Sequence, residues 1–172
     1  MDTIRLEEQQ DVLVQTAAVI AAQRQFAQRL RQRTVPDPLT GLPVRSLLID
    51  RLELALDAAR SDTGLLGVLS CNLDGITALE DRHGRAVADA ARAEAAGRLV
   101  SSVRQGDVVA RISAQTFVLL CPGITDAADA HGIARRVATA FDEPLHPRPD
   151  LDHRVRLSVG VALSGQIGRA HV

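Results

Sequence analysis

The chain has 172 residues, a net charge of −1 and a hydrophobic fraction of 46%, which suffices for one domain with a real core plus an extra element. The near-neutral charge argues against a nucleic-acid-binding protein, and the absence of lysine excludes any mechanism that needs a side-chain amine. No apolar stretch approaches the roughly 20 residues of a membrane span, and the acidic, polar N-terminus is unlike a signal peptide. We therefore expect a cytoplasmic protein in which Cys71 and Cys121, both in apolar runs, are buried free thiols.

Residues 1–34 are predicted to form one long helix. Leu6, Leu13, Ile20 and Ala27 recur every seven residues, and no glycine or proline interrupts the segment. This stripe favours a two-stranded coiled coil, and hence a homodimer through this helix, but its partner stripe is mostly polar. An amphipathic helix docked on a neighbour therefore stays an open alternative.

The remaining elements follow in a recognisable order. A turn in TVPDPLTGLPVR, stopped by proline and glycine, precedes a helix over residues 44–59 and a buried strand in GLLGVLSCNL. Residues 74–104 are helical, with a break near His83 and Gly84. Strands over 108–112 and 117–121 then form a β-hairpin, followed by a helix in DAADAHGIARRVATAFDEPL and a strand in HRVRLSVGVAL. This order predicts an α/β sandwich with an inserted antiparallel hairpin.

Four segments, in chain order, resemble the GGDEF family, the diguanylate cyclases. They are DPLTGLPVR, NLDGITALEDRHGRAVAD, RQGDVVARISAQTFVLL and VRLSVGVA, and together they run from Asp37 to about Ser164. The resemblance implies a GGDEF-type, nucleotidyl-cyclase-like α/β sandwich over residues 35–165. Its central mixed sheet would carry the β-hairpin, and the long helix of residues 1–34 would precede it as a signalling element.

The signature at the hairpin tip is degenerate. Ser113-Ala114-Gln115-Thr116-Phe117 stands where the family has Gly-Gly-Asp-Glu-Phe, and only Phe117 is kept. The family's reaction joins two GTP molecules into cyclic di-GMP with Mg²⁺, which prefers anionic oxygen ligands. The resemblance places the two acidic metal ligands at Asn72 and Gln115, which are neutral amides. We therefore expect no catalytic residues, no metal site and no cofactor, with Mg²⁺ relevant only if a residual diguanylate cyclase activity persists.

Two groups of residues are candidates for binding. The resemblance places nucleotide-binding remnants at Glu80 and Asp89, which would otherwise be ordinary acids on a helix surface. It also places an inhibitory RxxD site for cyclic di-GMP at Arg104 and Asp107, with Arg136 as a second clamp. An arginine offers a planar fork to phosphate or guanine. Each of these three residues also has a structural interpretation, as a helix-end cation, a turn cap or a solvated side chain.

The C-terminal end departs from the family. The last helix that the family has is absent here. The final residues, IGRAHV, are similar to a translated sequencing adapter, so we expect residues 166–172 to be a non-native tail. The alternative is that this is a genuine short tail. An EAL-type domain often follows such degenerate domains. The sequence thus predicts a degenerate, non-catalytic GGDEF domain in cyclic di-GMP signalling that binds cyclic di-GMP at the RxxD site and regulates a partner domain. A residually active cyclase and a ligand-free dimerisation module are the alternatives.

Overall fold

The computed structural model describes residues 14–26, 35–61 and 64–167, and it divides into two units, Met1–Val35 and Pro36–Val172. In the first unit, residues 14–26 form a helix whose described residues are all exposed, among them the apolar Val14, Val19, Ile20 and Phe26. The expected helix is confirmed over this range. The rest of residues 1–34, Leu6 and Leu13 included, lies outside the described part of the chain.

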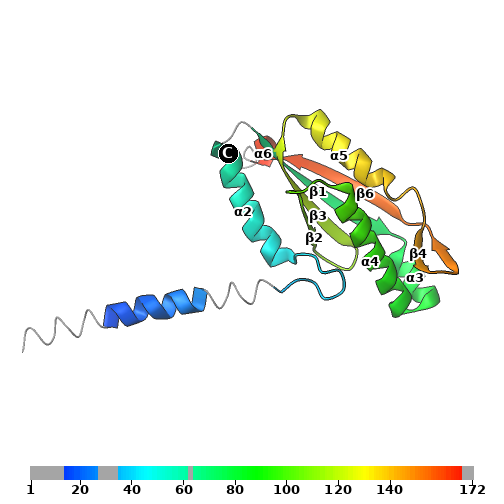
Figure 1. The fold of residues 1–172 in the computed structure, drawn as a ribbon, viewed down its shortest axis with the longest axis horizontal. Coiled ribbons are helices and arrows are strands. Elements are labelled where there is room, and N and C mark those ends of the chain that lie inside the picture. Colours follow the sequence, from blue (N-terminus) through cyan, green and yellow to red (C-terminus); the bar gives the residue numbers. More distant parts are fainter. Residues whose placement is uncertain (1–13, 27–34, 62–63, 168–172) are drawn as a thin grey trace, which may run out of the picture. The chain divides into compact units, whose positions relative to one another are not determined.

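The second unit is a layered α/β domain (Figure 1). Its elements are α2 (Arg45–Ser61), β1 (Leu65–Asp74), α3 (Ile76–His83), α4 (Arg85–Ser102), β2 (Val108–Arg111), β3 (Thr116–Ile124), α5 (Ala127–Thr139), β4 (Leu145–Arg148), β5 (Leu151–His153), β6 (Arg156–Leu163) and α6 (Ser164–Ile167). The α/β sandwich with a β2–β3 hairpin is confirmed. None of the described helices is long and apolar enough to span a bilayer.

The central sheet has the strand order β2-β3-β1-β6. All three of its ladders are antiparallel, and the parallel contact to it is an isolated bridge between Val44 and Arg111. The expected mixed sheet is therefore corrected to an antiparallel one. The reason is topological: each helical crossover returns the chain two strands away, so strands that run parallel, such as β1 and β2, are separated by an antiparallel neighbour.

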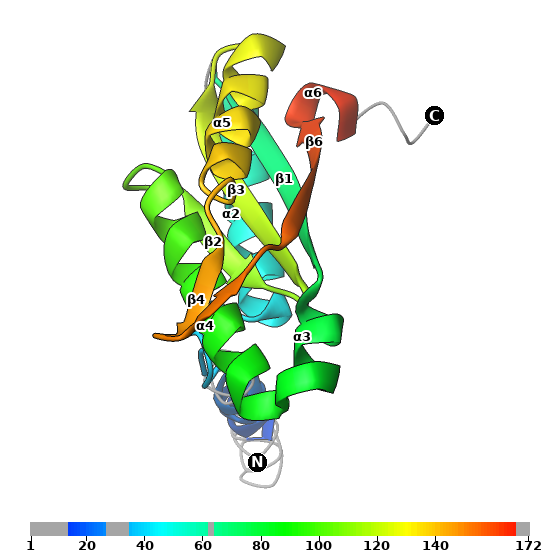
Figure 2. The same cartoon turned by 90° about the vertical axis from the view of Figure 1, so that its right-hand side faces the viewer.

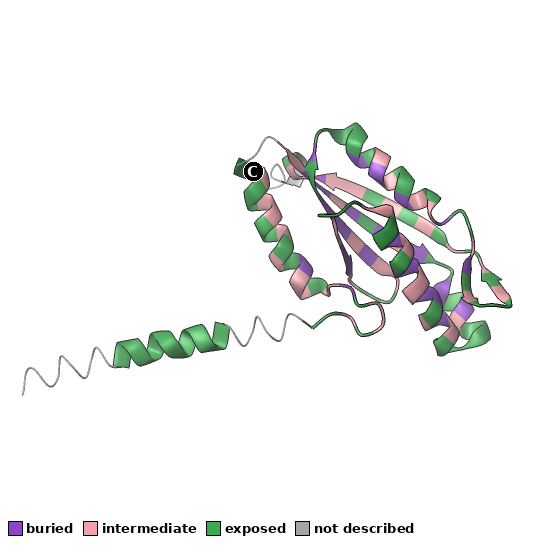
Figure 3. Cartoon of the chain, viewed as in Figure 1, coloured by how far each residue is buried: buried purple, intermediate pink, exposed green. Residues whose placement is uncertain are grey.

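The alternation of side chains along β1 explains the two layers of helices. Leu69, Cys71 and Leu73 belong to the core that also contains the buried faces of α4 and α5, whereas Leu66 and Val68 pack with α2 on the opposite face. Figures 1 and 2 show α2 on one side of the sheet and α4 and α5 on the other. The two inner strands of the sheet, β1 and β3, each carry five buried residues, and Figure 3 shows burial concentrated there.

Both cysteines lie inside the larger core, as expected. Cys71 and Cys121 are fully buried and unpaired. Desolvation by burial raises the pKa of each thiol to about 12, so neither is a reactive thiolate near neutral pH.

Two helix boundaries have different causes, one local and one long-range. The expected break is confirmed at Gly84, whose φ of 85° suits glycine and separates α3 from α4. The helix expected to run to residue 145 ends instead at Thr139. Beyond it, the Arg98 guanidinium donates hydrogen bonds to the carbonyls of Ala140, Glu143 and Pro144, which fixes a non-helical turn.

The short β4–β5 hairpin was not predicted from the sequence. Pro147 interrupts β4, and Pro149 lies in its turn, so the segment lacks the regular alternation of a strand. The fully buried Leu145 anchors the hairpin to the core beside α4. A tertiary contact, rather than strand propensity, decides its structure.

Candidate functional site

The exposed end of β1 lies beside the hairpin tip. Asn72 and Asp74 are on the same face of β1 as Leu66 and Val68, but α2 packs only on the part of the strand around those two earlier residues. Asn72 is paired in register with Thr116 of β3. The Asn72 amide donates to Asp74 (Nδ2 to Oδ1, 3.1 Å) and its oxygen accepts from the Thr116 hydroxyl (3.3 Å). The asparagine thus has partners for both ends of its amide within the protein.

The turn at the hairpin tip contains no glycine and is held by hydrogen bonds to a serine side chain. The Ser113 hydroxyl accepts from the backbone N–H groups of Gln115 (3.4 Å) and Thr116 (3.2 Å). No described residue other than glycine has a positive φ, so the replaced glycines are not needed for this turn. The Gln115 side-chain amide donates to the Thr77 hydroxyl (2.5 Å), and the backbone carbonyl of Gln115 accepts from Leu73 N–H (2.9 Å), which ties the tip to the end of β1.

These residues do not fit a Mg²⁺ ion. The two positions expected to carry acidic ligands hold the amides of Asn72 and Gln115, and both are engaged in hydrogen bonds. Asp74 supplies a carboxylate at the described end of β1, and it already accepts from Asn72. The described residues contain no group of three or more His, Cys, Asp or Glu side chains placed to hold a metal. A hard, strongly hydrated cation needs more anionic oxygen than this site offers.

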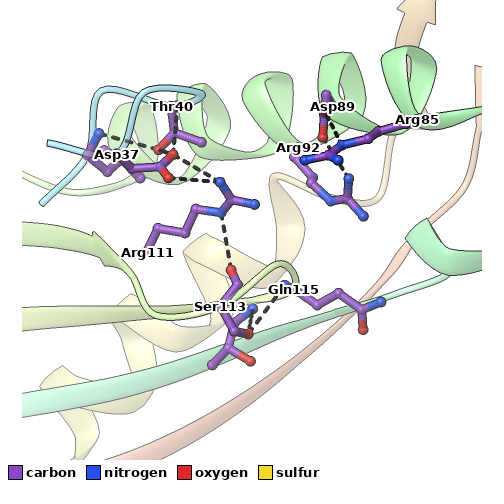
Figure 4. Close-up of polar contacts among 10 residues, drawn as sticks. Asp37, Thr40, Arg85, Asp89, Arg92, Arg111, Ser113 and Gln115 are labelled. Carbon is purple, nitrogen blue, oxygen red and sulfur yellow. Dashed lines mark hydrogen bonds and ion pairs between the residues drawn. The ribbon is translucent and has the colours of Figure 1, made fainter. Parts of the chain in front are cut away.

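Glu80 and Asp89 are brought together by an arginine that the sequence analysis missed. Arg92 donates from Nη2 to Glu80 (2.6 Å) and from Nη1 to Asp89 (2.7 Å), while the more exposed Arg85 lies 3.6 Å from Asp89 (Figure 4). Burial lowers the pKa of Arg92, but the two carboxylates outweigh it and raise that pKa. Its place on the alanine-rich buried face of α4, three residues after Asp89, was the available signal in the sequence.

Arg104 and Asp107 form a closed pair at the end of α4. The Asp107 carboxylate is 1% exposed and accepts from the Arg104 backbone N–H (3.1 Å) and from Nε (3.2 Å). The Arg104 side chain is 53% exposed and also donates to the Pro122 carbonyl. Asp107 therefore orients the arginine, and Arg104 is the member of the pair that reaches solvent.

Arg136 lies near this pair. Its Nε donates to the carbonyl of Ser102, the last residue of α4, at 2.7 Å. A groove of about 460 Å³ beside Arg104 is bounded by Leu42, Val100 and Arg51 among others. The structure thus brings the three expected residues to one end of α4, and it adds Arg51 from α2, which the sequence analysis did not single out.

A third polar cluster links the turn before α2 to the hairpin. Asp37 accepts two bonds from Thr40, and Arg111 Nη1 lies 3.0 Å from each of its carboxylate oxygens. Arg111 Nε donates to the Ser113 carbonyl at the hairpin tip (Figure 4). Burial raises the pKa of Asp37, but the bonds from Thr40 and Arg111 overcome this and lower it below its ordinary value.

A four-stranded antiparallel sheet with a β-hairpin between two helical crossovers, and helices on both faces, define a domain of the nucleotidyl-cyclase type. The family model for the diguanylate cyclase GGDEF domain matches residues 34–171. The chain belongs to the GGDEF domain family, whose place is in bacterial cyclic di-GMP signalling.

Curated relatives and solved structures agree with this assignment. The chain is 37% identical over 136 residues to the bifunctional diguanylate cyclase/cyclic di-GMP phosphodiesterase MucR of Pseudomonas aeruginosa, covering 78% of this chain and 19% of that protein. It is 31% identical over 127 residues to the diguanylate cyclase TpbB of the same species, covering 74% and 29%. The chain therefore spans less than a third of these relatives.

Two solved structures match the fold closely. The GGDEF domain of P. aeruginosa TpbB has a TM-score of 0.72 at 30% identity, covering 74% of each chain. A sensory box/GGDEF family protein from Caulobacter crescentus has a TM-score of 0.71 at 30% identity, covering 76% of this chain and 83% of that one. These matches confirm the fold class and the family expected from the sequence motifs.

Proposed function

We propose that this chain is a non-catalytic GGDEF domain that binds cyclic di-GMP at the end of α4 and passes that state to a partner domain. The observation that supports it most directly is the pair of amides at Asn72 and Gln115, both hydrogen-bonded within the protein. A phosphoryl-transfer site works by concentrating metal and positive charge around the phosphates. The described residues at this tip provide no such metal site, and Arg111, which donates to Ser113 there, is already paired with Asp37.

The end of α4 has the opposite character. Arg104 and Arg51 line the groove there, Arg136 is held at the end of α4 by its bond to the Ser102 carbonyl, and the buried Asp107 holds Arg104 in position. A cyclic dinucleotide carries two phosphate charges that suit such a cluster. Among structural neighbours, Vibrio cholerae LapD, a protein with an S helix, a GGDEF and an EAL domain, is described as bound to cyclic di-GMP, at 29% identity and a TM-score of 0.61.

Calorimetric titration of the chain with cyclic di-GMP tests this proposal. An arginine bond to a charged partner contributes about 1.5–3 kcal/mol, so Arg104→Ala is expected to weaken binding about tenfold to a hundredfold. Arg60→Ala, which removes the same charge from an exposed position on α2, and Gln115→Ala are the matched controls and should leave affinity unchanged. Absence of binding by the wild type, or equal binding by Arg104→Ala, would show that the arginine is structural.

A second function is favoured by the names of the relatives. MucR, TpbB and DgcP of P. aeruginosa are all named diguanylate cyclases. Residual conversion of GTP to cyclic di-GMP, with Mg²⁺, is therefore the alternative enzymatic activity. Formation of cyclic di-GMP from GTP and Mg²⁺ distinguishes the two functions, because only the cyclase makes this product.

A further inference from the structure

Arg92 is buried in a place where an arginine is unusual. It lies on the face of α4 that otherwise presents Ala88, Ala91 and Ala95 to the core, and it is 6% exposed. A charged side chain in such surroundings is stable only when it is paired. The two carboxylates that pair with it, Glu80 from α3 and Asp89 from α4, are each about one-third exposed.

The hydrogen-bond pattern of Arg92 resembles the edge of a guanine base. Its two Nη groups, in one plane, donate to one oxygen of Glu80 and one oxygen of Asp89. Guanine presents the same kind of edge, because its N1–H and exocyclic amino group are coplanar donors that a carboxylate accepts. The arginine therefore supplies, from within the protein, the donors that a base would bring.

The pairing is also hard to displace. Arg92 Nε is buried and has no hydrogen-bond partner among the described residues, so within that part of the chain the two carboxylates compensate for the buried charge. A base that took either carboxylate as its acceptor would draw it away from Arg92 and leave part of the arginine's charge uncompensated, which is costly in a protein interior. The single positive charge of Arg92 also neutralises half of the negative charge that Glu80 and Asp89 carry together.

We infer that Arg92 is an internal substitute for the guanine edge: it occupies Glu80 and Asp89 and closes this part of the domain to guanine nucleotides. The inference rests on the proposed function, in which the site that binds GTP in active diguanylate cyclases is non-catalytic in this chain. It goes further by naming the residue that determines whether a purine base is accepted there.

The experiment is calorimetric titration of wild type and Arg92→Met with GMP and, separately, AMP. Methionine keeps the length of the side chain and removes the donors. We expect weak wild-type binding with no preference for GMP, and at least tenfold tighter GMP binding by R92M with AMP unchanged. Arg85→Met is the matched control, because it removes the same charge beside Asp89 from an exposed position, and it should gain nothing.

Several outcomes would overturn the inference. They are a folded R92M variant that binds GMP no more tightly than the wild type, an equal gain for AMP, an equal gain in R85M, or a wild type that already prefers GMP. If R92M does not unfold cooperatively, E80Q/R92M, which removes the ion pair without changing net charge, carries the same expectation. Cyclic di-GMP binding should be unchanged in R92M, so a failure here is distinguishable from a failure at Arg104.

Discussion

The Asp37 carboxylate is the centre of a network that holds the turn before α2 against the hairpin strand. It accepts from the Thr40 backbone and hydroxyl and from Arg111, and both Asp37 and Arg111 are largely buried. Because Arg111 also donates to Ser113, the network reaches from the entry of the domain to the hairpin tip. One ion pair thus connects segments 74 residues apart.

Asp37→Asn is expected to lower the free energy of unfolding by about 2 kcal/mol at pH 7, since hydrogen bonds to a charged group are lost. The folded pKa of Asp37 lies below its unfolded value, so the carboxylate contributes stability above about pH 4 and loses it as the pH falls through the folded pKa. The difference from wild type should therefore shrink below that pH in urea unfolding series. Asp57→Asn, which breaks an exposed pair with Arg60, is the control and should change little. A difference that does not depend on pH would contradict the assignment.

At the scale of elements, the helix of residues 14–26 exposes apolar side chains that the heptad stripe predicts to pair with a second copy. Val19 and Phe26 are 57% and 66% exposed within this unit. A buried polar residue at a core position weakens a coiled coil. Leu13→Asn/Ile20→Asn is therefore expected to halve the sedimentation mass without unfolding the domain. Gln15→Asn/Ala22→Asn, placed off the stripe, should keep the mass, and an unchanged mass for the first variant would place dimerisation elsewhere.

The glycines of α4 and α5 offer a second prediction about elements. A Cβ atom added at Gly97 or Gly132 would meet no atom within 4 Å outside the backbone of its own helix. Alanine at each position is expected to stabilise the domain by about 0.5–1 kcal/mol, because glycine weakens a helix interior. Gly84→Ala should instead destabilise it, because φ is 85° there. The midpoint of urea unfolding measures all three, and stabilisation by Gly84→Ala would contradict the α3–α4 break.

For the whole molecule, the central question is whether GTP is turned over. We expect no cyclic di-GMP from GTP and Mg²⁺ in a chromatographic assay, because the positions expected to bind the metal hold Asn72 and Gln115, and Asp74 is already engaged. Such catalysis depends on electrostatic stabilisation that these amides do not supply. The GGDEF domain of TpbB under the same conditions is the positive control. Robust turnover by this chain would establish the cyclase alternative instead.

The sequence by itself determined the family, the order of the main elements and the presence of neutral amides at Asn72 and Gln115. Each depends on residue identity at fixed spacing or on side-chain periodicity, which are properties of a linear chain. The buried run of β1 and the break at Gly84 are of this kind. The proline-containing β4–β5 hairpin and the end of α5 are not, since long-range contacts decide them.

Only the tertiary structure decided how the candidate residues act. Arg92 and Glu80 are 12 residues apart on two helices, and they meet because Gly84 turns the chain between them. Asp107 is buried under Arg104, so it orients the arginine rather than facing solvent. The sequence lists the charges in order, but whether a carboxylate is free or neutralised depends on distance and burial, and folding alone sets these.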